Sequence, residues 1–243
     1  MFELLSADTP NGKKVSILLE ELGLKYKVTK INIYKGDQFR QSFSKISPFN
    51  KIPVLKDLKT KRTIFESGAI LIYLGEKYKK FYEKKDRLKI LQWLMAQMAY
   101  VGPMFGQHHQ FHHYNPGKSK FGEDRYFKIS ERIYRELDVR LGTSKFLAGD
   151  KYSIADIATF PWIARHEWHD IGLKRFENLY IIVLITKRKL IKNGRNHPFA
   201  KFEKVSKKKR RSKLLIEIKL GLAAIIIIKH RMVAIIEARR GLP

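Results

Sequence analysis

Hydrophobic and polar positions in the first 80 residues follow two different patterns. Short segments in which apolar residues are contiguous or occupy every second position predict strands over 2–7, 26–33, 53–56 and 63–65. Apolar residues at helical spacing predict helices over 13–23, 37–46 and 67–78. The resulting order, βαβ followed by α and then ββα, contains a parallel crossover unit of the right-handed kind. The pattern therefore predicts a small α/β domain.

The hydrophobic pattern changes after a short run of charged residues. From there on, apolar residues recur at helical spacing over 87–100 and 122–141. Ser153 followed by Asp156 resembles a capping box, with Asp in the place of Glu or Gln. This start predicts a helix that continues to about residue 169. The second part of the chain is therefore expected to be all helix.

Composition and charge set the C-terminal end apart. The chain has 243 residues and a net charge of +27, and more than half of this excess falls in residues 180–243. The run at 207–211 contains only Lys and Arg, which suits binding to nucleic acid or an anionic membrane, or simply a solvated tail. We expect an α/β domain over 1–82, a helical domain over 87–194, and a basic, Ile-rich tail over 195–243 whose structure the pattern does not define.

The chain contains no cysteine. This excludes a disulfide framework, a thiolate metal site and any reaction of a protein thiol, so a redox function needs a thiol from another molecule. The first residues lack the charged start and long apolar run of a signal peptide, and no apolar run approaches the roughly 20 residues that span a bilayer. We therefore expect a cytoplasmic protein.

Two segments carry the pattern of a site that holds a small peptide. Ile52-Pro53 enters a short apolar strand, and such a bond adopts the cis form at a cost of roughly 0.5–1 kcal/mol. A cis bond there turns the backbone N–H and C=O of Ile52 toward an extended ligand. Glu66 and Ser67 open the next helix, where Ser67 can cap the helix and present N–H groups to a carboxylate. By itself, a Glu-Ser pair at this position is more often only a helix cap.

These segments belong to a set of motifs that resembles the cytosolic glutathione transferases. The shared motifs are Lys51-Ile52-Pro53-Val54, the helix start at 65–70 and the Ser-Ile-Ala-Asp cap. Segments 9–14 (Thr-Pro-Asn-Gly-Lys-Lys) and 102–109 (Gly-Pro-Met-Phe-Gly-Gln-His-His) are similar to the bacterial Nu class. That class includes glutathione-dependent disulfide-bond oxidoreductases.

The resemblance covers about residues 1–178 and implies the fold class, α/β plus all-α. It implies a thioredoxin-like N-terminal domain, a helical C-terminal domain of the transferase type, a glutathione site between them and a homodimer. Nu-class proteins hold oxidised glutathione or two glutathione molecules per site and use no protein cysteine. We therefore expect glutathione as a bound cosubstrate and no metal. The chain departs from the family pattern after Leu179, and residues after about Gly194 do not match it.

The resemblance assigns the thiolate site to the turn before the first helix. The Thr9 hydroxyl and the N–H of Asn11 are expected to donate to the sulfur of glutathione, and the helix N-terminus adds positive potential. Stabilisation is needed because a free thiol, with a pKa of about 8.5, is mostly protonated at neutral pH. In isolation, the same Thr-Pro-Asn-Gly segment is an ordinary turn and helix cap.

The resemblance also assigns residues to the rest of the ligand. The backbone of Ile52, before Pro53, is expected to pair with the cysteinyl part. Glu66 is expected to take the γ-glutamyl ammonium and Ser67 the γ-glutamyl carboxylate. The remaining assignments, which in isolation are surface residues, are Gln38 and Lys51 near the glycyl end and Arg132 on the helix over 122–141.

Two enzymatic reactions and one binding role are compatible with such a site. In thiol–disulfide exchange, a bound glutathione thiolate attacks a small disulfide, and a second glutathione completes the reduction. Conjugation to an electrophilic substrate needs the same thiolate. A non-catalytic protein of this fold, with its basic tail on nucleic acid or a membrane, is the third alternative. We favour the disulfide-bond oxidoreductase.

Four histidines in one segment form two pairs at i,i+4 spacing, which metal sites also use. They are His108, His109, His112 and His113. Because no cysteine or carboxylate in the segment completes a metal set, we expect the histidines to form a polar rim of the substrate pocket or the dimer cleft.

Overall fold

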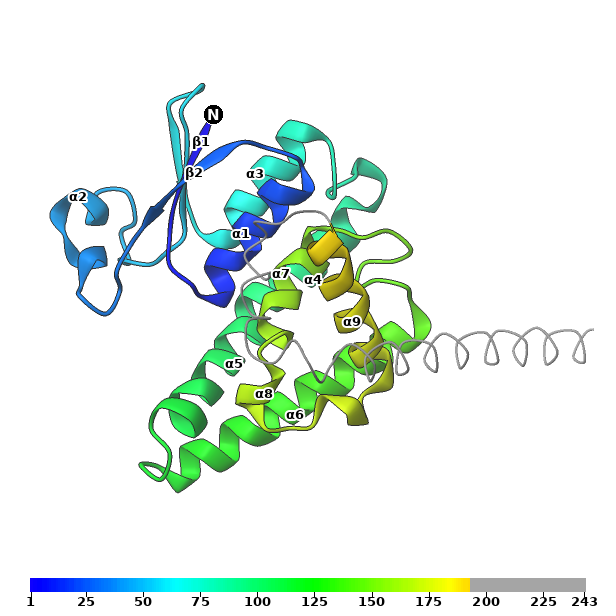
Figure 1. Ribbon diagram of the computed structural model, residues 1–243. Helices are drawn as coiled ribbons and strands as arrows, with labels where there is room; N and C mark the ends of the chain where they lie inside the picture. Colours follow the sequence, from blue (N-terminus) through cyan, green and yellow to red (C-terminus); the bar gives the residue numbers. More distant parts are fainter. Residues whose placement is uncertain (193–243) are drawn as a thin grey trace, which may run out of the picture. The chain divides into compact units, whose positions relative to one another are not determined.

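The computed structural model describes residues 1–192. Its N-terminal part contains a four-stranded sheet with the strand order β2-β1-β3-β4 (Figure 1). The strands are β1 Phe2–Ser6, β2 Tyr26–Lys30, β3 Val54–Asp57 and β4 Arg62–Phe65. β1 and β2 are parallel, whereas β3 is antiparallel to both β1 and β4. This mixed sheet confirms the predicted α/β order.

Helices cover both faces of this sheet. On one side, α1 (Pro10–Glu21) and α3 (Ser67–Tyr78) pack together, and both also contact the helical part of the chain (Figure 1). On the other side lies the short helix α2 (Gln41–Ser44), after the 3-10 turn η1 (Asp37–Phe39). Successive residues of a strand point to opposite faces, so Leu4 and Leu5, which are both buried, bury both faces of β1.

Helix α1 begins three residues earlier than the hydrophobic pattern predicts, at Pro10 instead of residue 13. Thr9 is the N-cap, and its Oγ1 accepts a hydrogen bond from the Gly12 N–H at 3.1 Å. Proline suits the first helical position, where its fixed φ is helical and its missing N–H is no loss. Gly12 is required because a Cβ there would lie 2.6 Å from the backbone carbonyl oxygen of Ala7. The glycine thus lets the N-terminus of α1 approach the end of β1 closely.

The second part of the described chain is all helix, as predicted. The helices are α4 Arg87–Ala96, α5 Gly102–His108, α6 Lys120–Thr143, α7 Ile154–Ile163, α8 His166–His169 and α9 Glu177–Lys192. Two π-helical segments follow α4 and α5, namely η3 Gln97–Val101 and η4 His109–Tyr114. Two 3-10 turns, η2 Lys84–Asp86 and η5 Leu173–Arg175, precede α4 and α9. Figure 1 shows α5 and α6 running side by side away from the sheet.

Helix α7 is buried along its whole length. The predicted capping box is present, since the Ser153 Oγ accepts from the Ala155 N–H and the Asp156 carboxylate accepts from the Ser153 N–H at 2.9 Å. The prediction that this helix continues to about residue 169 is wrong. At Arg165 the backbone leaves the helical region (φ −92°, ψ 24°), and a separate short helix follows. Apolar spacing continues across this turn, so the pattern alone could not reveal it.

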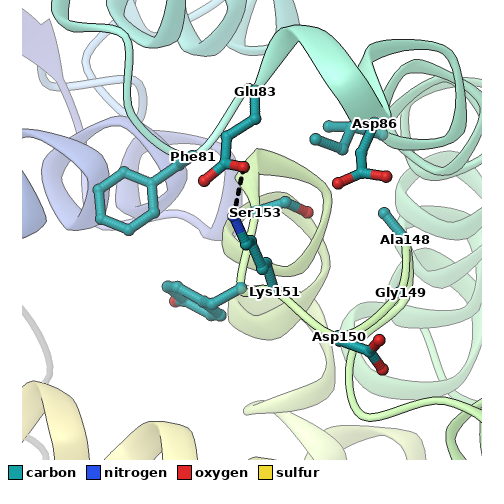
Figure 2. A pocket seen from close by; sticks show the side chains of 10 residues that line it. Phe81, Glu83, Asp86, Ala148, Gly149, Asp150, Lys151 and Ser153 are labelled. Atoms are coloured by element: carbon teal, nitrogen blue, oxygen red, sulfur yellow. Dashed lines mark hydrogen bonds and ion pairs between the residues drawn. The ribbon is translucent and has the colours of Figure 1, made fainter.

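The segment that links the two parts is anchored to the start of α7. The Ile154 N–H donates to the Phe81 carbonyl at 2.9 Å, and the rings of Phe81 and Tyr152 meet edge to face. Lys151 and Glu83 form an ion pair of 2.7 Å beside a hollow at the surface (Figure 2). None of the residues assigned to glutathione lines this hollow, which lies where the linker contacts the helical part of the chain.

None of the helices in residues 1–192 is long and apolar enough to cross a membrane. The tail over 195–243 lies outside the described residues. The boundaries of the two preceding domains, 1–82 and 87–194, remain predictions.

Candidate glutathione site

The N-terminus of α1 offers hydrogen-bond donors at the position assigned to the glutathione sulfur. The Thr9 Oγ1 accepts from the Gly12 N–H, which leaves the hydroxyl hydrogen available to a ligand. Asn11 lies in the first turn of α1, where backbone N–H groups have no partner within the helix. Because a helix N-terminus also carries positive potential, this turn can stabilise a thiolate.

Two cationic side chains lie around the same turn. Lys13 is buried and forms an ion pair with Asp8 at 2.7 Å. Burial lowers the pKa of Lys13, and the carboxylate of Asp8 opposes this effect. From the helical part, Arg165 donates to the Asp8 carbonyl at 3.1 Å and lies 4.4 Å from the ring centroid of Trp168. Sequence reasoning missed Arg165, because it is 157 residues away from Asp8 along the chain.

The Ile52-Pro53 peptide bond is cis, as the sequence predicts. The preceding turn is held by Ser47, whose buried hydroxyl donates to the Lys51 carbonyl at 2.8 Å and accepts from the Lys51 N–H at 3.2 Å. The Ile52 side chain packs on a buried cluster formed by Leu5, Ile31, Phe43 and Val54. This packing fixes Ile52 on the face of the sheet covered by α2.

Glu66 and Ser67 form the start of α3. Glu66 is exposed and has φ +66° and ψ 118°, a conformation that a residue with a side chain rarely adopts. Such backbone geometry persists where the surroundings enforce it and is frequent at ligand sites. Ser67 is 5% exposed, and its hydroxyl points toward the Met98 sulfur at 3.7 Å. A thioether is a weak acceptor, so a ligand carboxylate can readily replace it as partner of this hydroxyl.

A buried lysine lies directly beneath Ser67. Lys14 is 1% exposed, and its Nζ lies 2.7 Å from the Gln97 Oε1 and 3.5 Å from the Ser67 Oγ. Burial lowers the pKa of Lys14 to about 7, although the carboxylate of Glu66 acts in the opposite direction. Sequence reasoning did not select Lys14. The signal available was a lysine on the apolar side of α1, next to Val15 and Leu18.

Within residues 1–192, three assigned residues form no hydrogen bond or ion pair with Thr9, Glu66 or Ser67. Gln38 lies in η1, and its Nε2 donates to the Ile33 carbonyl at 3.2 Å. Lys51 is exposed. Arg132 lies on α6 with 73% of its side chain exposed, 4.0 Å from the Glu136 carboxylate. The roles assigned to these three residues remain predictions.

Comparisons with known proteins establish the family. The family model described as glutathione S-transferase, N-terminal domain, matches residues 9–77, and the model of the corresponding C-terminal domain matches residues 93–181. The disulfide-bond oxidoreductase YfcG of Escherichia coli is 44% identical over 170 residues, which cover 67% of this chain and 79% of YfcG. The chain belongs to the glutathione S-transferase family. This confirms the resemblance and the two-part fold class inferred from the sequence motifs.

Other members of the glutathione S-transferase family give the same result. The disulfide-bond oxidoreductase YghU of Escherichia coli is 39% identical over 173 residues; the match covers 66% of this chain but only 59% of the length of YghU. A transferase structure from Pseudomonas fluorescens with two glutathione bound has 36% identity and a TM-score of 0.71, covering 82% of this chain and 91% of that one. A Pseudomonas putida transferase with one glutathione disulfide per subunit has 35% identity and a TM-score of 0.72, covering 84% and 92%.

In this glutathione S-transferase, two of the four clustered histidines are part of the helical core. His108 and His109 are buried, so the expectation of a polar rim is wrong for both. His109 stacks on His169 with ring centroids 4.7 Å apart, and His108 donates through Nε2 to the His169 carbonyl at 2.8 Å. Burial lowers the pKa of all three, that of His109 to about 3. Residues 1–192 contain no group of three side chains suited to hold a metal ion.

Proposed function

We propose that this glutathione S-transferase is a glutathione-dependent disulfide-bond oxidoreductase. The observation that carries the proposal is the start of α1, where the Thr9 hydroxyl and the first-turn N–H groups converge in a chain without cysteine. The names of YfcG and YghU support it, because both are called disulfide-bond oxidoreductases. The structures with two glutathione or one glutathione disulfide bound support a site that accommodates both thiols.

Glutathione binds across the three segments that the sequence motifs define. The backbone of Ile52 pairs with the cysteinyl part, and the start of α3 holds the γ-glutamyl end through Glu66 and Ser67. Thr9 and the N–H of Asn11 then face the sulfur. Lys51, Gln38 and Arg132 complete the assigned set at the glycyl end and at the side of the helical domain.

The reaction is thiol–disulfide exchange on the bound thiolate. The glutathione sulfur attacks one sulfur of a small disulfide, which forms a mixed disulfide and releases the other sulfur as a thiolate. A second glutathione thiolate attacks the glutathione sulfur of the mixed disulfide. This step releases the second substrate thiol and leaves glutathione disulfide, so two glutathiones are oxidised for each disulfide reduced. The protein lowers the barrier by stabilising and orienting the thiolate.

The test is an assay of glutathione-dependent reduction of 2-hydroxyethyl disulfide by the full chain. Thr9→Val removes the hydroxyl while keeping the shape of the side chain and should lower kcat/KM about tenfold to a hundredfold. Thr9→Ser keeps the hydroxyl and should retain most activity. Asn11→Ala should also retain most activity, because the proposed donor is the backbone N–H.

Two outcomes would favour the alternatives. Turnover of 1-chloro-2,4-dinitrobenzene without disulfide reduction would replace the proposal by conjugation to electrophiles. Glutathione binding without either reaction would indicate a non-catalytic protein, and steeply salt-dependent binding of nucleic acid would then indicate a role for the basic tail.

We further propose that the chain forms a homodimer. Leu88 and Met95, seven residues apart on the same face of α4, are 69% and 43% exposed, and Tyr100 in η3 is 43% exposed. Apolar side chains that gather at the surface mark protein interfaces. Light scattering of the full chain should give twice the mass of 28.6 kDa, and Leu88→Glu should lower it.

A further inference from the structure

Lys14 is a buried cation surrounded by neutral groups. Its Nζ donates to the Gln97 Oε1 at 2.7 Å, and the Ser67 Oγ and the Met98 sulfur lie at 3.5 Å and 3.7 Å. Gln97 is fully buried, and Ser67 is 5% exposed. Within residues 1–192, no carboxylate is hydrogen-bonded to Lys14. A buried ammonium is costly unless a negative charge accompanies it, so the site lacks an anion.

The ionisable groups on the elements packed against Lys14 do not supply this anion. Glu66, at the start of α3, interacts with Lys14 through its charge but is exposed to solvent. Several other carboxylates near these elements have their own partners: Asp8 with Lys13, Glu20 with Tyr26, Glu76 with Arg87, and Asp156 with Ser153 and Leu147. Lys77 of α3 pairs with Asp57. The missing negative charge is therefore expected from a ligand.

The position of Ser67 indicates where the negative charge of the ligand would bind. As a donor-only group, Lys14 makes the Ser67 Oγ an acceptor, so the hydroxyl hydrogen of Ser67 is directed away from the lysine. This hydrogen and the N-terminus of α3 are the donors assigned to the γ-glutamyl carboxylate. A carboxylate bound there is linked to Lys14 through the Ser67 hydroxyl.

We propose that Lys14 is a positioning residue of the γ-glutamyl site, whose ammonium balances the bound carboxylate through Ser67, so that glutathione binding takes up a proton. The inference rests on the proposed glutathione site but not on the reaction performed there. Lys14 does not contact the ligand. It holds Ser67 in its donating orientation and supplies positive charge beneath it.

The pH dependence follows from the pKa of Lys14, which burial lowers to about 7 in the free protein. A carboxylate nearby stabilises the ammonium and raises this pKa. Below pH 7, Lys14 is already charged and binding is strongest. Above pH 7, a proton must be taken up, so affinity falls by up to tenfold per pH unit until the pKa of the complex is reached.

Titration calorimetry with S-methylglutathione tests this inference in the full chain. The methyl group removes the ligand thiol, so its ionisation does not contribute. Affinity of the wild type should fall about eightfold from pH 6.5 to pH 8. Comparing buffers with different heats of ionisation at pH 7.5 should show uptake of about three quarters of a proton.

Two variants of Lys14 separate charge from packing. Lys14→Met fills a similar volume without charge and should bind about tenfold more weakly at pH 6.5, with no pH dependence and no proton uptake. Lys14→Arg stays charged at all these pH values and should bind nearly as well at pH 8 as at pH 6.5. Lys120→Met, an exposed substitution on α6, should behave as the wild type. Circular dichroism establishes that each variant is folded.

The outcomes distinguish this inference from the proposed function. If the wild type binds S-methylglutathione with an affinity independent of pH, or if Lys14→Met retains the pH dependence, the role of Lys14 is overturned while the glutathione site stands. If the wild type binds neither S-methylglutathione nor glutathione, the proposed site itself is wrong.

Discussion

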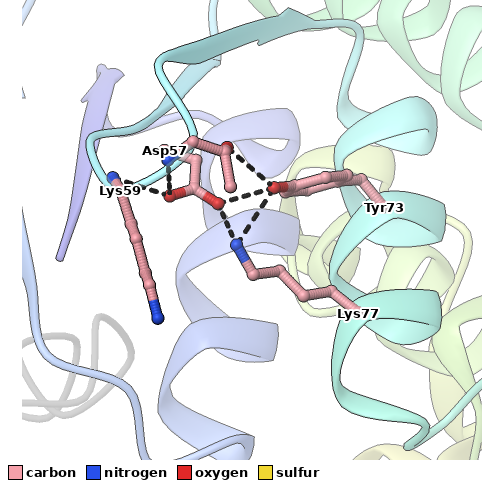
Figure 3. Close-up of polar contacts among 5 residues, drawn as sticks. Asp57, Lys59, Tyr73 and Lys77 are labelled. Carbon is pink, nitrogen blue, oxygen red and sulfur yellow. Dashed lines mark hydrogen bonds and ion pairs between the residues drawn. The ribbon is translucent and has the colours of Figure 1, made fainter.

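The two ends of α3 hold buried charges in opposite ways. At its N-terminal end, the Lys14 ammonium is surrounded by neutral Ser67, Gln97 and Met98. Toward its C-terminal end, Tyr73 and Lys77 both donate to the buried carboxylate of Asp57 at the end of β3 (Figure 3). The N–H groups of Lys59 and Thr60 donate to the same carboxylate at 3.0 Å and 3.3 Å.

We interpret the charge of Asp57 as structural and the charge of Lys14 as part of the proposed ligand site. Burial alone would raise the pKa of Asp57, but the hydrogen bonds from Lys77, Tyr73 and the two N–H groups hold it well below its usual range. The charge of Asp57 is therefore balanced inside the fold, where it ties β3 to α3. The charge of Lys14 has no such balance among the described residues, which is expected where a ligand supplies the opposite charge.

The largest effect on stability is expected from Asp57, whose charge is balanced by hydrogen bonds inside the fold. Asp57→Ala should lower the free energy of unfolding by about 3 kcal/mol, because it removes a buried, charged acceptor that receives hydrogen bonds from four donors. Urea unfolding followed by circular dichroism measures this difference.

Asp57→Asn is the matched control, since it keeps an oxygen acceptor but removes the charge. It should lose less stability than Asp57→Ala. Equal losses for the two variants would mean that packing, and not the hydrogen bonds drawn in Figure 3, accounts for the role of Asp57.

The sequence predicts the outline of the fold because local signals and burial agree there. Helix α3 has the predicted bounds, and the cis bond before Pro53 and the capping box at Ser153 are where the motifs indicate. The predicted helix start at residue 13 is wrong because proline is typical both of turns and of the first turn of a helix, and Pro10 occupies the latter position.

The site could be predicted only where its residues lie within motifs. Thr9, Ile52, Glu66 and Ser67 belong to short segments whose chemistry is visible in sequence. In the sequence, Lys14 is one of two consecutive lysines at the start of a helix, a pattern typical of exposed residues. Its burial depends on Ser67 and Gln97, which are 53 and 83 residues away along the chain, so no local pattern reports it. For the same reason the sequence did not show that His108 and His109 are buried.

One substitution applied to two lysines should change stability in opposite directions. Lys77→Met leaves the Asp57 carboxylate, 1% exposed, without its cation and should lower the free energy of unfolding by about 2 kcal/mol. Lys14→Met removes a buried charge without a paired anion and should raise the free energy of unfolding by about 1 kcal/mol, even though the Gln97 Oε1 loses its donor.

Urea unfolding at pH 6.5 without ligand makes this comparison directly. Without ligand, Lys14→Met should be more stable than the wild type. With a saturating concentration of S-methylglutathione, the wild type should be the more stable of the two, because ligand binding raises its free energy of unfolding by more. Destabilisation by both substitutions would show that Lys14 is a structural charge like Lys77, and the contrast between the two ends of α3 would be lost.

A fold can also bury an ionisable group in its neutral form. The buried histidines of the helical part, His108, His109 and His169, are examples. Burial, followed by the nearby charge of Arg165, lowers the pKa of His109 to about 3. The unfolded chain binds a proton at His109 below about pH 6.5, whereas the folded chain does not. Stability from this residue is therefore present above pH 6.5 and is lost as the pH falls, by about 1 kcal/mol at pH 5.5.

The variant His109→Phe should reduce this acid sensitivity. Phenylalanine keeps the ring between Trp162 and His169, and the Nε2 of His109 has no hydrogen-bond partner within residues 1–192 that would be lost. Between pH 7.5 and pH 5.5 the variant should lose about 1 kcal/mol less unfolding free energy than the wild type. The exposed His113, changed to Phe in the same way, is the matched control and should leave the pH dependence as it is in the wild type. If the free energy of unfolding changed with pH in the same way for His109→Phe and the wild type, His109 would become protonated inside the fold. The fold would then hold a second buried charge without a paired anion, and this feature would no longer distinguish the ligand site at Lys14.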